Sequence, residues 1–168
     1  HMLSLAYENV NQAFDQLLQF SDKIDEQIYK REDTVNYLNK VISEYISTAL
    51  ATPNLNVNIS QALSSYYLML VDIERISDYA VNMNHQATKR LQGDMTISEI
   101  EIVEHMKKLC VDMKNDLDDV EEAERKDDVI DSLVSSWREA QIQALKQKKC
   151  SSEVSMMLSR IFTDFERI

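Results

Sequence analysis

Apolar residues recur at three- and four-residue steps through most of this 168-residue chain, which is the spacing that places them on one face of an α-helix. Stretches with Pro, Gly or paired Ser interrupt this pattern, and cap-like Ser, Asn and Asp residues mark two softer breaks. The pattern predicts six helices, over residues 3–20, 22–50, 59–92, 96–114, 116–148 and 152–168.

The helix predicted over 59–92 has the widest apolar face. Its members follow one another at helical spacing, and they are Ile59, Leu63, Tyr66, Leu70, Ile73, Ala80, Asn84 and Leu91, widened by Met69, Ile76, Met83 and Ala87. A face of this width predicts packing against two neighbouring helices, as in a three-helix bundle.

Two short sequences each occur twice. An acid, an apolar residue, an acid, Arg and Ile stand in this order at 72–76 and again at 164–168. A second pair, at 32–38 and 127–133, shares an acid, a β-branched apolar residue, Asn or Asp, and Leu at matched positions. Repeats of this kind predict a duplicated structural unit.

We therefore expect two tandem three-helix bundles, over residues 3–93 and 94–168, with residues 1–2 as a cloning remnant. Because the sequence stops directly at the second copy of the repeated phrase, whereas the first copy continues into a longer helical pattern, we expect the second bundle to be truncated at its last helix. Truncation would leave apolar surface around Val129, Leu133 and Trp137, and we expect homo-oligomers to form through it.

Composition narrows the class further. One Gly and one Pro leave little material for β-turns, which predicts an all-α fold. A net charge of -11 argues against nucleic-acid binding, which needs clustered Lys and Arg. Two distant cysteines indicate reduced thiols in the cytoplasm, and no apolar run is long enough to span a bilayer.

Acidic residues with helical spacing are the candidate chemistry. Glu74 and Asp78 are four positions apart, as are Asp127 and Asp131, and like charges so placed destabilise a helix unless a positive group lies nearby. If a neighbouring helix supplies further acids, the converging oxygens suit iron, zinc, manganese or magnesium. A solvated surface, or salt bridges to Arg75 or Arg167, would explain the same pattern.

Patterns typical of enzymes are absent from the sequence. A single Gly excludes a Gly-rich phosphate loop. Di-iron proteins of the ferritin type use Glu followed three positions later by His, whereas Asn82 and Ile102 precede His85 and His105 here. We therefore expect no catalytic activity.

The run DIERISDYAVNM, residues 72–83, resembles a signature of the PhoU family, and residues 32–38 and 127–133 resemble the family's other signature. Within that family the chain looks most like the cytoplasmic C-terminal region of bacterial sodium/phosphate cotransporters, through residues 37–47 and 150–168. The resemblance implies two three-helix bundles, surface metal clusters, and a role in controlling phosphate uptake.

Carried over residue by residue, the resemblance implies one metal site with Glu32, Glu74 and Asp78 and another with Asp127, Asp131 and Glu166. The cofactor would be a divalent or iron-type ion. Two departures weaken these sites: Asn36 replaces a family acid, and the second site lacks its last acid.

The implied partner is a membrane-embedded transporter segment of the same chain, or a separate phosphate transporter, with this region on the cytoplasmic side of the inner membrane. A free-standing phosphate-uptake regulator and a helical adaptor without metal are the alternatives.

Overall fold

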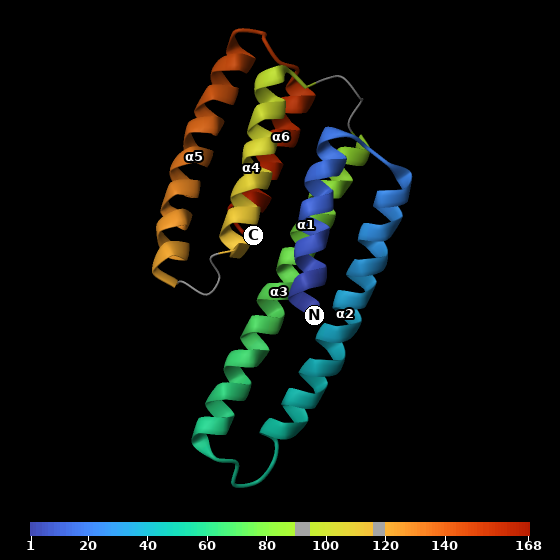
Figure 1. Ribbon diagram of the computed structural model, residues 1–168, viewed down its shortest axis with the longest axis vertical. Coiled ribbons are helices and arrows are strands. Elements are labelled where there is room, and N and C mark those ends of the chain that lie inside the picture. The colour runs from blue at the N-terminus through green and yellow to red at the C-terminus, as the bar shows by residue number, and fades with distance from the viewer. Residues whose placement is uncertain (90–94, 116–119) are drawn as a thin grey trace.

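The computed structural model describes residues 1–89, 95–115 and 120–168, except for the side chains of residues 120, 121 and 123. All regular structure in these ranges is helical (Figure 1), which confirms the predicted all-α class. The helices are α1 (Met2–Leu18), α2 (Asp22–Leu50), α3 (Val57–Lys89), α4 (Ile97–Asn115), α5 (Val120–Lys146) and α6 (Ser152–Phe165). Each predicted helix is present, with small shifts at its ends.

Side chains at the helix starts explain several of these boundaries. The Thr96 Oγ1 accepts a hydrogen bond from the Glu99 backbone N–H at 3.4 Å, and Glu99 Oε2 accepts one from the Thr96 N–H at 2.7 Å, which forms a capping box. Ser151 Oγ accepts from Val154 N–H at 3.2 Å. Before α2, the side chain of Gln16 hydrogen-bonds the backbone of Ser21 in both directions.

Three predictions fall outside the described residues. They concern Leu91 in the apolar face, the loop at Gly93-Asp94 with the boundary between the two units, and the break at Asp116.

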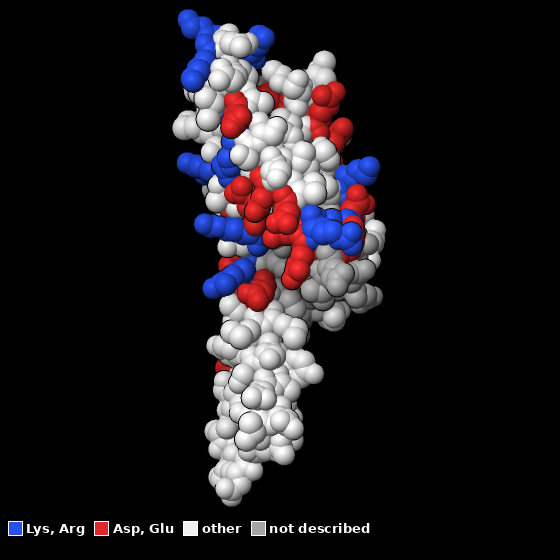
Figure 2. All heavy atoms as spheres, turned by 90° about the vertical axis from the view of Figure 1, so that its left-hand side faces the viewer, with Lys and Arg blue, Asp and Glu red and all other residues white. Residues whose placement is uncertain are grey.

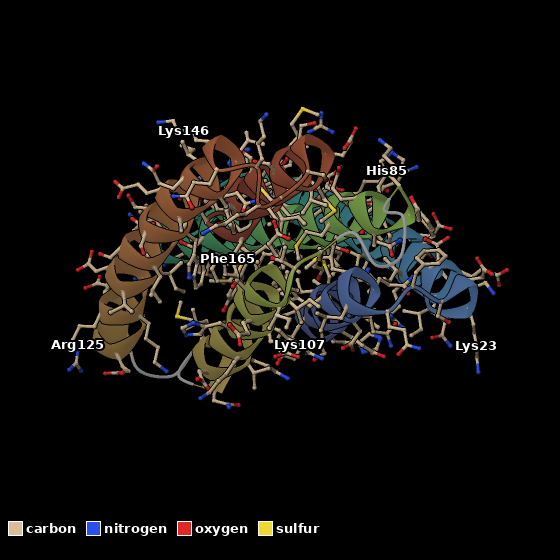
Figure 3. All side chains as sticks on the ribbon, turned by 90° about the horizontal axis from the view of Figure 1, so that it is seen from above. Lys23, His85, Lys107, Arg125, Lys146 and Phe165 are labelled. Atoms are coloured by element: carbon tan, nitrogen blue, oxygen red, sulfur yellow. The ribbon has the colours of Figure 1, made fainter. Side chains whose placement is uncertain are left out.

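Helices α1, α2 and α3 pack together as one unit, and α4, α5 and α6 form a second unit beside it (Figure 1). Contacts of α1 with α4 and of α3 with α6 join the two units. At this junction Lys107 of α4 lies toward α1 (Figure 3) and its Nζ is 2.5 Å from Asp15 Oδ1.

The main apolar core lies where the two units meet. Phe14 and Leu17 of α1, Met83 of α3, Met106 of α4 and Phe162 of α6 are almost completely buried in it. Phe165 points inward among the helices (Figure 3), and its ring meets that of Phe14 edge-on at 6.3 Å. Burying each such side chain contributes about 2 kcal/mol to folding.

The wide apolar face predicted on α3 is buried along only half of its length. Ala80, Met83 and Asn84 are buried, but Tyr66 and Met69 remain more than half exposed, at 56% and 52%. Helix α1 runs beside only the C-terminal part of α3, while α2 and α3 project beyond it (Figure 1). Among the described residues, the predicted second neighbour therefore covers only the C-terminal part of this face.

The surface around Val129, Leu133 and Trp137 is smaller than expected. Trp137 is half-buried and stacks on Phe162, with ring centroids 6.2 Å apart. Leu133 is half-buried as well, which leaves Val129 exposed. Self-association through this surface stays a prediction.

A helix that spans a bilayer needs about 20 consecutive residues that are mostly apolar. Across the described ranges, the helices do not meet this requirement.

Candidate carboxylate site

Helices α2 and α3 bring two acids of the first predicted set, Glu32 and Asp78, together, and Glu74 lies near Asp78 on α3. Glu32 of α2 is only 8% exposed and lies against Asp78 of α3, which is close enough to alter its protonation. The hydroxyl of Ser77 donates a hydrogen bond to Glu32 Oε2. The other oxygen, Oε1, is buried and finds no hydrogen-bond partner among the described residues. The site therefore holds a buried carboxylate with one oxygen hydrogen-bonded and the other without a partner among the described residues.

The surroundings favour uptake of a proton or a cation at this point. Burial is the largest cause that raises the pKa of Glu32, and the negative charge of Asp78 raises it further, while the nearby polar side chains of Ser77 and Asn36 act in the opposite direction. Burial, followed by the charge of Asp78, also raises the pKa of Glu74, and Arg75 partly offsets this. Each shift reflects the cost of holding like charges close together in a poorly solvated place.

A polar network through the first unit fixes the position of Glu32. Asn9 of α1 donates through Nδ2 to Ser77 Oγ at 3.2 Å and to the Ile28 carbonyl at 3.3 Å. Arg31 of α2 donates through Nε to Asn9 Oδ1 at 2.8 Å. Asn9 thus connects three helices at the level of Glu32, and hydrogen bonds of this kind between helices make the local arrangement specific.

Sequence reasoning missed Asn9, Arg31 and Ser77. Ser77 carried the strongest signal, because it directly precedes Asp78 within the resemblance. Asn9 carried a weaker one, since it is a polar residue among the apolar positions of α1. Nothing in the sequence marked Arg31 as their partner.

The second predicted set is arranged differently. Asp127 and Glu166 line one cavity of about 200 Å³ between the two units. Asp131 is exposed and is not among the residues that line this cavity. Glu166 Oε2 already accepts a hydrogen bond from Arg138 Nη2 at 2.8 Å. A cation from the protein itself therefore neutralises one of the predicted metal ligands.

The two arginines named as competing partners make their contacts outside the two predicted sets, although the charge of Arg75 still acts to lower the pKa of Glu74. Arg75 pairs with Asp72 at 3.6 Å on the exposed surface of α3. Arg167 lies over the ring of Tyr79, 5.9 Å from its centroid. Arg138, which the sequence did not single out, also donates to Thr163 Oγ1 at 3.1 Å and is thereby held in place.

The two sets fit a metal ion unequally. Within the described ranges, His, Cys, Asp and Glu side chains do not assemble in groups of three or more suited to a metal ion. The first set nevertheless offers a buried oxygen without a donor, beside a second carboxylate, and this chemistry suits a hard cation. At the second set the guanidinium of Arg138 competes for Glu166. Both metal sites stay predictions.

Comparison with known proteins places this geometry in context. A protein-family model, that of the PhoU domain, matches residues 1–87, just over half of the chain. This range contains Glu32, Glu74 and Asp78. A curated relative is the phosphate-specific transport system accessory protein PhoU homolog 1 of Thermotoga maritima. It is 24% identical over 179 residues, and the alignment covers 99% of this chain and 76% of the relative.

Proposed function

This chain belongs to the PhoU family, and we propose on that basis that it is a non-catalytic regulator of phosphate uptake. The relative from Thermotoga maritima carries a name that assigns it to phosphate-specific transport as an accessory protein. Absence of the sequence patterns of phosphate-loop and di-iron enzymes agrees with a regulatory role.

The observation that carries the proposal is the pairing of the two signature segments. Residues 32–38 of α2 and 72–83 of α3 lie side by side, with Ser77 bonded to Glu32 and Asp78 beside it. Residues from two distant segments therefore build one site, within the range that the family model matches.

The finer proposal concerns the partner. We propose that the chain acts on a membrane-embedded phosphate transporter, as the cytoplasmic domain of a sodium-dependent cotransporter. Residues 37–47 and 150–168 support this version through their resemblance to that group. A free-standing regulator is the alternative, and the two differ in whether transporter and regulator share one chain.

Uptake of radiolabelled phosphate tests the regulatory role. A bacterial strain deleted for its own PhoU-type regulator is complemented with this chain or with an empty vector. We expect the chain to change the initial uptake rate, and Asp78→Asn to reduce that change. The control is Asp33→Asn, which alters an exposed acid next to Glu32. A well-expressed chain that leaves uptake unchanged would contradict the proposal.

Thermal unfolding with added metal tests the cofactor. A cation that binds only the folded state stabilises it by about 2.7 kcal/mol at a concentration one hundred times its Kd. If Glu32, Glu74 and Asp78 hold a cation, manganese, zinc or ferrous iron raises the melting temperature, and Asp78→Asn loses this increase while Asp33→Asn keeps it. An unchanged melting temperature would favour the adaptor without metal.

A further inference from the structure

A series of hydrogen bonds reaches Glu32 by way of α1. Glu32 Oε2 accepts from the hydroxyl of Ser77, and Ser77 Oγ accepts in turn from Asn9 Nδ2 at 3.2 Å. Asn9 Oδ1 accepts from Arg31 Nε at 2.8 Å. We call Arg31, Asn9, Ser77 and Glu32 the relay. It passes from α2 to α1, then to α3, and back to α2.

The chemistry of its members gives the relay one direction. A guanidinium can only donate and a carbonyl can only accept. Arg31 therefore fixes the oxygen of the Asn9 amide on its own side, and the Ile28 carbonyl, 3.3 Å from Nδ2, fixes the nitrogen. Nδ2 then donates to Ser77 Oγ. A serine hydroxyl has a single proton, and here that proton is directed to Glu32 Oε2.

Helix α1 holds the start of the relay in place. Arg31 is paired with Glu8 at 3.3 Å, and its Nη2 also donates to Gln12 Oε1. Its side chain is only 15% exposed. Asn9 and Ser77 are completely buried, so bulk solvent does not reach them. The relay is therefore a fixed part of the first unit.

The relay determines which oxygen of Glu32 is free. Oε2 is held by Ser77, whereas Oε1 is buried and has no partner among the described residues. Because one oxygen is held, the orientation of the whole carboxylate is set, and Oε1 is the oxygen left to bind a cation beside Asp78. Groups that orient a metal ligand in this way typically contribute roughly 10- to 100-fold to metal affinity.

We propose that Asn9 and Ser77 are positioning residues for the cation site of the first unit. They hold the Glu32 carboxylate so that Oε1 is presented to the cation, and neither of them is itself a ligand. Helix α1 thereby belongs to the site, although none of the three predicted ligands lies on it. This inference rests on the cation proposed above for this site, and it is independent of the role in phosphate uptake.

Calorimetric titration with Mn²⁺ tests the proposal. Ser77→Ala removes the donor to Glu32 and should weaken Mn²⁺ binding roughly 10- to 100-fold, whereas Ser77→Thr keeps a hydroxyl and should keep most of the affinity. Ser64→Ala is the matched control, because it removes the same hydroxyl from an exposed position of α3. The free energy of unfolding of each variant, measured without metal, separates a loss of affinity from a loss of folding.

Asn9→Asp tests the direction of the relay. The new carboxylate has nearly the same shape and still accepts from Arg31, but it cannot donate to Ser77. The Ser77 proton is then drawn to this carboxylate, and Glu32 Oε2 loses its donor. We expect weaker Mn²⁺ binding although a negative charge is added. Asn58→Asp, which adds the same charge at an exposed position, should not weaken it.

Acids elsewhere on the surface also attract Mn²⁺, and the titration must separate their contribution. Figure 2 shows acidic side chains gathered on the body of the molecule, on the side where α5 lies. Asp128 and Asp131 of α5 are exposed. Asp78→Asn removes a ligand from the first-unit site alone, so the binding that this variant loses is the binding that belongs to the site.

Equal Mn²⁺ affinities of the unaltered chain and Ser77→Ala would overturn the proposal and leave the cation site intact. Equal weakening by Ser77→Ala and Ser64→Ala, or full affinity in Asn9→Asp, would overturn it too. If the unaltered chain shows no Mn²⁺ binding that Asp78→Asn removes, both the positioning role and the cation site are overturned. The uptake assay would then decide the role in phosphate uptake separately.

Discussion

Two copies of the same short phrase meet opposite surroundings in this protein. On α3, Glu74 lies near Asp78, which in turn faces the buried Glu32, so acids gather there. On α6, the equivalent residue Glu166 pairs with Arg138 of α5. Neighbouring helices, rather than the phrase itself, decide whether its second acid gathers with like charges or is neutralised.

The side chains that join neighbouring helices also differ between the two units. In the first unit, Asn9 and Ser77 join α1, α2 and α3 by hydrogen bonds. In the second, Trp137 of α5 lies against the rings of Phe162 and Phe165 of α6, with centroids 6.2 and 6.4 Å away. Directional polar contacts thus join all three helices of the first unit, whereas aromatic packing joins α5 to α6 in the second, where Gln141 also donates to the buried Glu99 at 2.9 Å.

The largest effect is expected in the second unit. Phe162→Ala removes a ring that is 1% exposed and should lower the free energy of unfolding by about 4 kcal/mol, since the ring's burial is lost and a cavity remains. Denaturant unfolding measures this change. Ile142→Ala, at an exposed position of α5, should change it by less than about 0.5 kcal/mol. Equal values for both variants would contradict an aromatic core.

In the first unit, removing the side-chain amide of Asn9 should lower the free energy of unfolding although it deletes few atoms. Asn9→Ala removes the hydrogen bonds to Ser77, to the Ile28 carbonyl and from Arg31, and should lower the free energy of unfolding by about 2 kcal/mol. The same measurement on Asn82→Ala, at an exposed site of α3, provides the control. A loss as small as that of the control would show that the network does not hold the helices together.

Glu32→Gln should instead raise the free energy of unfolding at neutral pH. The folded state raises the pKa of Glu32 above its ordinary 4.5, so the folded protein binds this proton more tightly than the unfolded chain. The stability contributed by Glu32 is therefore complete below that value and declines as the pH rises through the folded pKa. At neutral pH, Glu32→Gln should add about 1 kcal/mol, the lower end of the cost of a buried unpaired polar group.

Melting curves across a pH series measure this gain. The gain should disappear in mildly acidic buffer, where Glu32 itself is protonated. A destabilised Glu32→Gln variant at neutral pH would refute the view that Glu32 and Asp78 repel each other without added cation.

The smallest effect is expected at the corresponding acid of α6. Glu166→Gln removes a partly exposed pair with Arg138 and should lower the free energy of unfolding by about 0.5 kcal/mol. The loss should shrink in high salt, because dissolved ions screen such pairs. If Glu32→Gln raises the free energy of unfolding and Glu166→Gln lowers it, the contrast between the two acidic sites is confirmed. Changes of the same sign in both variants would contradict it.

Much of the fold could be predicted from the sequence, because helical periodicity and caps are local. Thr96 and Ser151 begin α4 and α6 as expected from their cap chemistry. The covering of α3 could not be predicted, since it depends on where α1 lies in space. For the site, the spacing identified Glu74 and Asp78 and the resemblance added Glu32, but the spacing could not reveal that Arg138 reaches Glu166.

The sequence by itself determined that this protein is helical, duplicated and acidic, and that its acids stand at helical spacing. These properties follow from residue types and their intervals along one chain. The tertiary structure alone decided which acid pairs with Arg138 and which acid is buried beside another acid. Both depend on contacts between helices distant in sequence, and burial raises the pKa of a carboxyl such as Glu32 only after those helices have packed.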